Sequence, residues 1–195
     1  MPRLPLLPKE ASDPVTAEVF ETFTREGREP IALYRVLAHS PLLLRAYGGL
    51  ARGLRYEAQT PRTLRELMIL RTAQLTSSQY EWAHHRAMAE AAGVPAEQVA
   101  ALAQWRTSDL FDESERAALG AVEGIHDIAL SDEAFAELER TAGAGATVEL
   151  VLLSAFYQAV ARVIQAFGLE VEPEYQPYLG GPGGPLVSAE EEREL

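Results

Sequence analysis

The stretch from residue 60 to residue 102, TPRTLRELMILRTAQLTSSQYEWAHHRAMAEAAGVPAEQVAAL, decides the fold that this sequence predicts. It opens with a Thr-Pro pair, a typical helix start, because proline at the first helical position removes no hydrogen-bond donor that the helix needs. In a helix over about residues 61–76, Glu66 shares an apolar stripe with Ile69 and Leu70, which follow it by three and four residues. An unpaired charge is costly to bury, so a carboxylate on such a stripe is unusual.

A second helix follows almost at once, with Ser78 as its N-cap and Gly93 at its end. One face of this helix carries titratable and apolar side chains together: Glu81, His84, His85, Met88 and Ala92. Helices joined by so short a turn are expected to be antiparallel neighbours. The sequence therefore predicts that Glu66 lies within hydrogen-bond reach of His85, with Glu81 close to both.

The acidic residues of this pair also have structural interpretations. Ser78 and Glu81 fit a capping box, in which each side chain bonds to the free backbone N–H of the other residue. Glu66 can form an ion pair on a solvated helix face with one of three arginines: Arg62, Arg65 or Arg71. Both interpretations stay open beside a catalytic one.

The spacing of the polar residues resembles a known family. Eleven residues separate Glu66 from Ser78, two separate Ser78 from Glu81, and three separate Glu81 from His85. This pattern resembles the carboxymuconolactone decarboxylase and alkylhydroperoxidase D (AhpD)-like family. In the AhpD branch, the two cysteines of a CxxC motif stand where this chain has Ser78 and Glu81. The cysteine-free decarboxylase branch is more similar, because its Tyr-Glu-Trp followed by His is matched by four residues: Tyr80, Glu81, Trp82 and His85.

The resemblance extends from about residue 30 to about residue 175. It includes the apolar segment at residues 148–168, VELVLLSAFYQAVARVIQAFG, and Glu170, Glu172 and Pro173 after it. It implies an all-α fold, an AhpD-like helical bundle built around the antiparallel helix pair, and a homo-oligomer, either a trimer or a hexamer. The absence of any sustained alternation of period two independently favours an all-α fold.

The resemblance implies a cofactor-free lyase or isomerase that acts on a small carboxylated lactone or a related ring compound. His85 would relay a proton to the carbanion or dienolate left by loss of CO2, with Glu66 as its partner. Glu81 would orient His85 or share the proton. The candidate substrate-binding residues are Tyr80, Trp82, His84 and Ser78, although the two aromatic residues can equally be packing side chains.

Two other functions remain open from the sequence. One is a peroxidase-related AhpD-like protein without the CxxC thiols, and the other is a non-catalytic oligomeric binding protein. The chain has no cysteine, which excludes a thiol cycle, a disulfide or a thiolate metal site within it. An anionic substrate calls for a cation, and Arg71 and Arg86 are candidates only because they are near in sequence.

A metal site is the less favoured hypothesis. The motifs Glu81-x-x-His84 and Glu123-x-x-His126, with Glu66 and Glu149, could supply the ligands of a di-iron site. Against it, Gly124 interrupts the second motif, and the carboxylate and Glu-x-x-His helices do not alternate. We therefore predict no metal and no cofactor.

Composition limits the partners. The chain has 195 residues, 47% of them hydrophobic, and a formal net charge of −12. This acidic balance argues against nucleic acid and anionic membranes, and no run approaches the ~20 apolar residues of a membrane span. The start lacks the pattern of a secretory signal, so a cytoplasmic location is expected.

One all-α domain is predicted over residues 1–170, preceded by a Pro-Leu arm at residues 1–12. The arm's leucines are expected to pack on a surface, such as that of a neighbouring subunit. Residues 171–195 are expected to be a Pro/Gly-rich acidic tail. In the helix predicted from Pro41 to about Ala58, the residues expected to face the core are Leu43, Ala46, Tyr47, Leu50 and Leu54, with Ala51 as a further candidate.

Overall fold

The computed structural model describes residues 2–181 and 183–185, and in that part of the chain the secondary structure is entirely helical. This confirms the predicted all-α fold. The α-helices are α1 (Pro14–Arg25), α2 (Ala32–Leu37), α3 (Pro41–Arg52), α4 (Arg62–Leu75), α5 (Gln79–Ala92), α6 (Ala96–Ala101), α7 (Glu113–His126), α8 (Asp132–Ala142) and α9 (Ala144–Phe167). A π-helical turn, η1 (Gly53–Glu57), follows α3, and two 3₁₀ turns are η2 (Leu102–Gln104) and η3 (Pro173–Tyr178).

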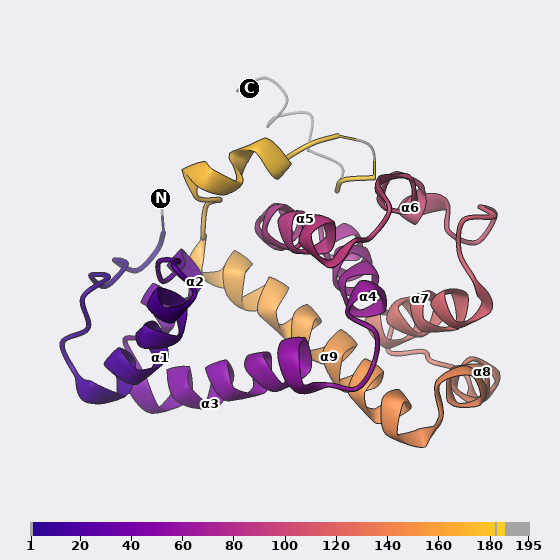
Figure 1. Ribbon diagram of the computed structural model, residues 1–195, viewed down its shortest axis with the longest axis horizontal. Helices are drawn as coiled ribbons and strands as arrows, with labels where there is room; N and C mark the ends of the chain where they lie inside the picture. Colours follow the sequence, from indigo (N-terminus) through magenta and orange to yellow (C-terminus); the bar gives the residue numbers. More distant parts are fainter. Residues whose placement is uncertain (1, 182, 186–195) are drawn as a thin grey trace.

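Helix α4 is the centre of the molecule. It packs against α5, α7 and α9. Helices α1–α3 lie on one side of α4, and helices α6–α8 lie on the other (Figure 1). Four successive apolar residues of α4, Leu67 to Leu70, are all buried, because neighbours cover the helix on every side. Any polar side chain on α4 therefore has to find its partners inside the protein.

The α4–α5 pair forms as predicted. Ser78 caps α5 by accepting a hydrogen bond from the Glu81 N–H at 3.4 Å, and Gly93 ends the helix in the left-handed conformation with φ of 85°. Proline precedes α4, and the Glu149 carboxylate from α9 binds the two backbone N–H groups just ahead of it. These local signals fix where both helices begin and how they face each other.

The predicted core face of α3 and the turn after it is right for Leu54 and Ala51 but wrong for Leu43 and Leu50. Leu43 and Leu50 are 68% and 47% exposed, whereas Leu44, Ala51 and Leu54 are buried. The segment carries leucines on both faces, so periodicity alone does not determine which stripe packs inward. The inward stripe is the one that continues into η1, because η1 contacts α9.

Helix α9 is longer and more apolar than the sequence analysis allowed for. Its 24 residues could cross a membrane by length and composition alone, contrary to the prediction that no segment could. It packs against α4, α7 and α8, and core helices often meet the same criteria, so this is weak evidence for a membrane span.

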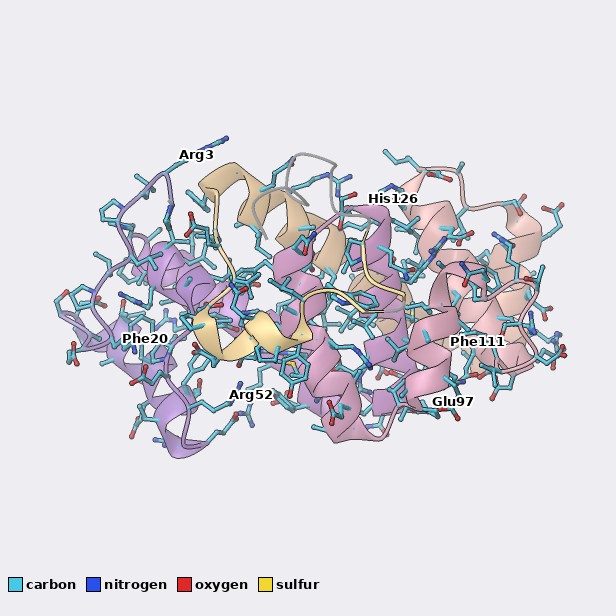
Figure 2. The ribbon with its side chains drawn as sticks, turned by 90° about the horizontal axis from the view of Figure 1, so that it is seen from above. Arg3, Phe20, Arg52, Glu97, Phe111 and His126 are labelled. Atoms are coloured by element: carbon cyan, nitrogen blue, oxygen red, sulfur yellow. The ribbon has the colours of Figure 1, made fainter. Side chains whose placement is uncertain are left out.

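Both terminal segments pack on the domain. In the N-terminal arm, Leu6 and Leu7 contact the core, and the Arg35 Nε donates to the Leu7 carbonyl at 2.6 Å. Leu6 and Leu7 are therefore covered within the chain, whereas Leu4 is 40% exposed. Beyond residue 170, the segment predicted as a tail forms η3, which packs on α5 over the middle of the molecule (Figure 2). Residues 186–195 lie outside the described residues.

Candidate active site

Glu66 is completely buried and has two charged or polar partners. Its Oε2 lies 2.8 Å from Nδ1 of His85, and its Oε1 accepts a hydrogen bond from Nε of Arg62 at 2.6 Å. The predicted hydrogen bond to His85 is therefore confirmed, and the alternative ion pair with Arg62 is present too, although inside the protein. Burial by itself would raise the pKa of Glu66, but His85 and Arg62 outweigh it and hold that pKa below its ordinary value.

His85 is the neutral partner of this pair. Burial lowers the pKa of its imidazole, and although the Glu66 carboxylate opposes the change, the charge of Arg55 lowers the pKa further. A neutral imidazole next to a carboxylate keeps its proton on Nδ1 and donates it to Glu66. Its Nε2 makes no hydrogen bond to any residue in the described part of the chain and is left as a proton acceptor.

Glu81 sits near this pair in a different electrostatic environment. Burial raises the pKa of its carboxyl to about 8, with the nearby Ser78 hydroxyl opposing the rise. Neither carboxyl oxygen has a hydrogen-bond partner among the described residues. The capping box is therefore only half formed: Ser78 caps the helix, but the Glu81 side chain does not return the bond to Ser78. At neutral pH the carboxyl is mostly protonated and can donate a hydrogen bond or a proton.

His85 and Glu81 line a small, partly open cavity of about 40 Å³ between α2, α3, η1, α5 and α9, and Glu66 lies behind His85. Room of this size admits a few water molecules or one small chemical group. The ring of Tyr157 packs edge-on against His85, with ring centroids 4.8 Å apart. The polar residues around the cavity are Tyr34, Tyr47, Arg55, Tyr80, Glu81, His84, His85 and Tyr157.

The C-terminal segment packs against two residues that line the cavity, Tyr80 and His84. Glu172 accepts hydrogen bonds from the Ala32 N–H and the Tyr80 hydroxyl, and it lies 2.7 Å from Nε2 of His84. The His84 ring is held between Tyr80 and Tyr175, with ring centroids 4.4 and 3.7 Å away. We call residues 172–178, which include η3, the strap. His84 and Tyr80 therefore line the cavity while also holding the strap.

The structure brings five of the seven predicted site residues to one place and leaves two elsewhere. Glu66, His85, Glu81, His84 and Tyr80 gather at the cavity. Trp82 points away from it, into the second core cluster with Leu67, Val99 and Leu102. Ser78 caps α5 and lines a separate groove on the outside of the helix pair.

Sequence reasoning missed the cation and most of the tyrosines of the site. Arg71 is paired with Glu123 at 2.6 Å, and neither Arg71 nor Arg86 lines the cavity; Arg55 does. Arg55 lies in the π-helical turn, and such turns are frequent at functional sites, but the sequence gives no signal for one. Tyr34, Tyr47 and Tyr157 come from three different helices, so only the fold shows that they converge.

The residues considered for a di-metal site do not converge. Glu149 binds backbone N–H groups ahead of α4, and Glu123 binds Arg71, Trp105 and Arg106. Within the described ranges, no group of three acidic or histidine side chains is placed to hold a metal ion. Gly124 has a packing role instead, because a Cβ there would lie 2.9 Å from the Leu130 backbone.

We expect the purified protein to contain no stoichiometric iron, zinc or manganese, because the candidate ligands in the described ranges do not converge on one point. Elemental analysis of protein prepared without chelators measures this directly. About two metal ions per chain would contradict it and replace proton transfer with di-metal chemistry.

A buried carboxylate–imidazole pair, a protonated carboxyl and no thiol distinguish this cysteine-free helical bundle. The sequence model described as "Carboxymuconolactone decarboxylase family" matches residues 41–124, which include Glu66, Glu81 and His85. This match supports the resemblance to the carboxymuconolactone decarboxylase and AhpD-like family that the spacing of the polar residues predicted.

Solved structures share the fold over nearly the whole chain. A cysteine-to-alanine variant of the debrominase Bmp8 in complex with 2,3,4-tribromopyrrole is 24% identical, with a TM-score of 0.77 over 91% of this chain and 97% of that one. An uncharacterised peroxidase-related protein from Silicibacter sp. TM1040 is 18% identical, with a TM-score of 0.73 over 89% and 95%. A peroxidase-related protein with an AhpD core from Ralstonia eutropha JMP134 is 19% identical, with a TM-score of 0.71 over 89% and 94%. No curated protein matches the chain.

Proposed function

We propose that this chain is a cofactor-free enzyme that transfers protons to carbon in a small molecule, a lyase or isomerase of the carboxymuconolactone decarboxylase type. One observation carries the proposal: the buried Glu66–His85 pair opens on a cavity beside the unpartnered carboxyl of Glu81. Enzymes that run acid and base chemistry together often hold two titratable groups whose environments push their pKa values in different directions. Here burial keeps His85 neutral and Glu81 protonated.

In this mechanism His85 is the general base and Glu81 the general acid. Nε2 of His85 accepts a proton from the substrate, and the Glu66 carboxylate stabilises the imidazolium that forms. In a decarboxylation, the bond between carbon and the leaving CO2 breaks and its electron pair stays on carbon. A proton from Glu81 or from the imidazolium then forms the new C–H bond. Arg62, which pairs with the same carboxylate, keeps Glu66 ionised throughout.

The family and its solved members support a small cyclic substrate. The family is named for a decarboxylase of a carboxylated lactone, and the Bmp8 structure holds a small ring compound, 2,3,4-tribromopyrrole. This chain cannot carry out thiol-dependent chemistry with its own residues, since it has no cysteine. Proton transfer is the chemistry that its own residues at the cavity can perform.

The proposal is tested by incubating the protein with a panel of small carboxylated lactones and ring acids in D2O, without added metal or cofactor. We expect one of them to release CO2 and to incorporate one deuterium at the carbon that lost it. If members of the panel bind in a calorimeter but none releases CO2 or exchanges a C–H proton, the enzyme proposal fails and a binding protein remains.

The strap should depend on the Glu172 carboxylate for its attachment. We expect Glu172→Gln to lower the free energy of unfolding by about 1–3 kcal/mol, because two charge-assisted hydrogen bonds are weakened inside the protein. Urea denaturation measures this. Glu174→Gln is the matched control, since it makes the same change on an exposed residue of η3. Equal stability of the two variants would show that Glu172 does not hold the strap.

A further inference from the structure

Arg55 is a cation at the candidate active site. It lines both the cavity beside His85 and a groove of about 180 Å³ between α1 and α3. Its side chain makes two hydrogen bonds, from Nε to the Ala51 carbonyl at 3.2 Å and from Nη2 to the Tyr34 hydroxyl at 3.3 Å. In the part of the chain that the structure describes, no carboxylate pairs with it. A guanidinium has five N–H donors, so most of them remain available.

The backbone of Arg55 is fixed relative to the Glu66–His85 pair. Its carbonyl, in the π-helical turn, accepts hydrogen bonds from Arg62 at 3.1 Å and Arg65 at 3.0 Å. Arg62 also binds Glu66, so a single side chain ties the turn to the catalytic carboxylate. Contacts within the protein, which also involve the acid–base site, therefore fix the backbone that carries the Arg55 guanidinium.

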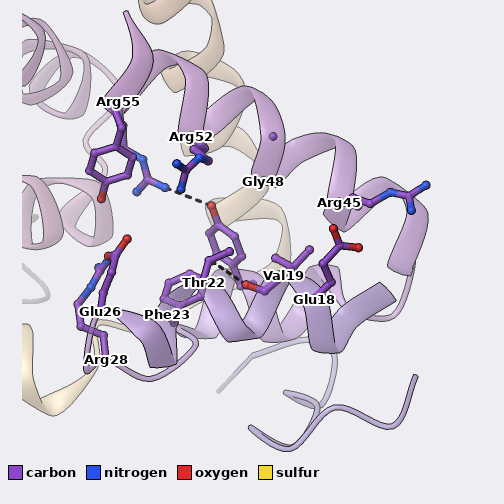
Figure 3. Close-up of a pocket in the computed structure, with 13 residues that line it drawn as sticks. Glu18, Val19, Thr22, Phe23, Glu26, Arg28, Arg45, Gly48, Arg52 and Arg55 are labelled. Atoms are coloured by element: carbon purple, nitrogen blue, oxygen red, sulfur yellow. Dashed lines mark hydrogen bonds and ion pairs between the residues drawn. The ribbon is translucent and has the colours of Figure 1, made fainter. Parts of the chain in front are cut away.

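Two of the three other arginines that line the groove differ from Arg55 in their partners, and the third, Arg45, does not line the cavity. Arg28 is paired with Glu26, and Arg52 is paired with Glu57. Figure 3 shows Arg28 and Arg52 around the groove and the dashed contact from Arg55 to the Tyr34 hydroxyl. The positive charge of Arg28 and Arg52 is therefore neutralised within the protein, whereas that of Arg55 is not.

We propose that Arg55 binds the carboxylate of a small carboxylic acid, whose uncharged part extends into the cavity toward His85 and Glu81. A partly buried cation is stabilised by an anion that replaces its lost hydration, and the planar guanidinium matches a carboxylate through two parallel hydrogen bonds. Of the two acid–base groups at the cavity, His85 is neutral and Glu81 is protonated, so neither offers the ligand a full charge. Tyr34, Tyr47 and Tyr157 provide aromatic walls for a planar ligand.

This assignment depends on the proposed function in one respect only, namely which end of the bound ligand reacts. The carboxylate at Arg55 is the binding group, and the reacting carbon is the one placed beside His85. Anion binding can therefore be measured without turnover, and its outcome does not depend on whether the chain is an enzyme.

The test is isothermal titration calorimetry with acetate and with acetamide, its uncharged analogue of the same shape, because the cavity has room for one small chemical group. We expect the wild-type protein to bind acetate and not acetamide. Arg55→Gln should weaken acetate binding by about 10–100-fold, the usual cost of a lost hydrogen-bonded charge. Arg52→Gln removes a charge from the same groove, but one already paired with Glu57, and should bind acetate as the wild type does.

Three results would overturn the assignment: no acetate binding by the wild type, equal binding of acetamide, or acetate binding that Arg55→Gln leaves unchanged. Circular dichroism establishes that each variant is folded. If Arg55→Gln is unstable, Arg55→Lys replaces it, since it keeps the charge but loses the planar fork. Weaker acetate binding by the Arg55→Lys variant supports the site, and unchanged binding contradicts paired hydrogen bonds at Arg55.

Discussion

His85→Gln is expected to lower turnover of a true substrate by about 10²–10⁴, the usual contribution of a positioned acid or base. Glutamine keeps a polar side chain of similar length but cannot accept and return a proton. Glu66→Gln should give a loss on the same scale, because it removes the charge that stabilises the imidazolium 2.8 Å away. The double variant should be little slower than the worse single variant, since the two groups act as a unit.

Steady-state kinetics of the three variants decide this, with His39→Gln as the control. His39 is exposed and bonds to the N-terminal arm, so its replacement should not change turnover. Losses that multiply in the double variant would mean that Glu66 and His85 act independently. Full activity of His85→Gln would remove the mechanism altogether.

Glu81→Gln is expected to stabilise the protein at high pH. In the folded protein burial raises the pKa of Glu81 to about 8, from an ordinary value of 4.5. Between these values the folded state holds a proton that the unfolded state has released, so the stability contributed by this group falls as pH rises from 4.5 to 8. Glutamine resembles the protonated carboxyl and does not titrate. Above pH 8 the variant should therefore be more stable than the wild type by about 5 kcal/mol, because a change of one in a pKa corresponds to about 1.4 kcal/mol.

Urea denaturation of the wild type and the variant at pH 4.5, 7 and 9 measures the difference. Effects of all other titrating groups cancel to first order, because both proteins contain them. Glu90→Gln is the matched control, since Glu90 is exposed on the same helix. A stability difference that does not change between pH 4.5 and 9 would show that Glu81 has an ordinary pKa, and it would lose its role as the acid.

The sequence predicted the central helix pair well, because the residues that begin and end each helix lie next to that helix in the sequence. A proline precedes α4, Ser78 caps α5 and Gly93 ends it, so the register of Glu66 against His85 follows from the two helices alone. The family resemblance points to the same residues. For this reason the hydrogen bond between Glu66 and His85 could be predicted before the structure was known.

The rest of the site depends on contacts between distant segments. Glu172 reaches Tyr80 across 92 residues, and Tyr157 reaches His85 from another helix. Arg55 could not be predicted, because its position depends on a π-helical turn that has no sequence signature. Glu81 was ambiguous, since Ser-x-x-Glu is also a capping signal; the structure shows a cap that leaves the carboxyl free.

The central claim is that His85 is neutral, with its proton on Nδ1 shared with an ionised Glu66. Histidine ¹⁵N NMR at pH 7 tests this most directly, because the chemical shifts of the two ring nitrogens report the tautomer and the charge. We predict a protonated Nδ1 and an unprotonated Nε2 for His85, and a changed tautomer balance in Glu66→Gln. A His85 ring that is protonated on both nitrogens at pH 7, or on Nε2 alone, would contradict the assignment of His85 as the base.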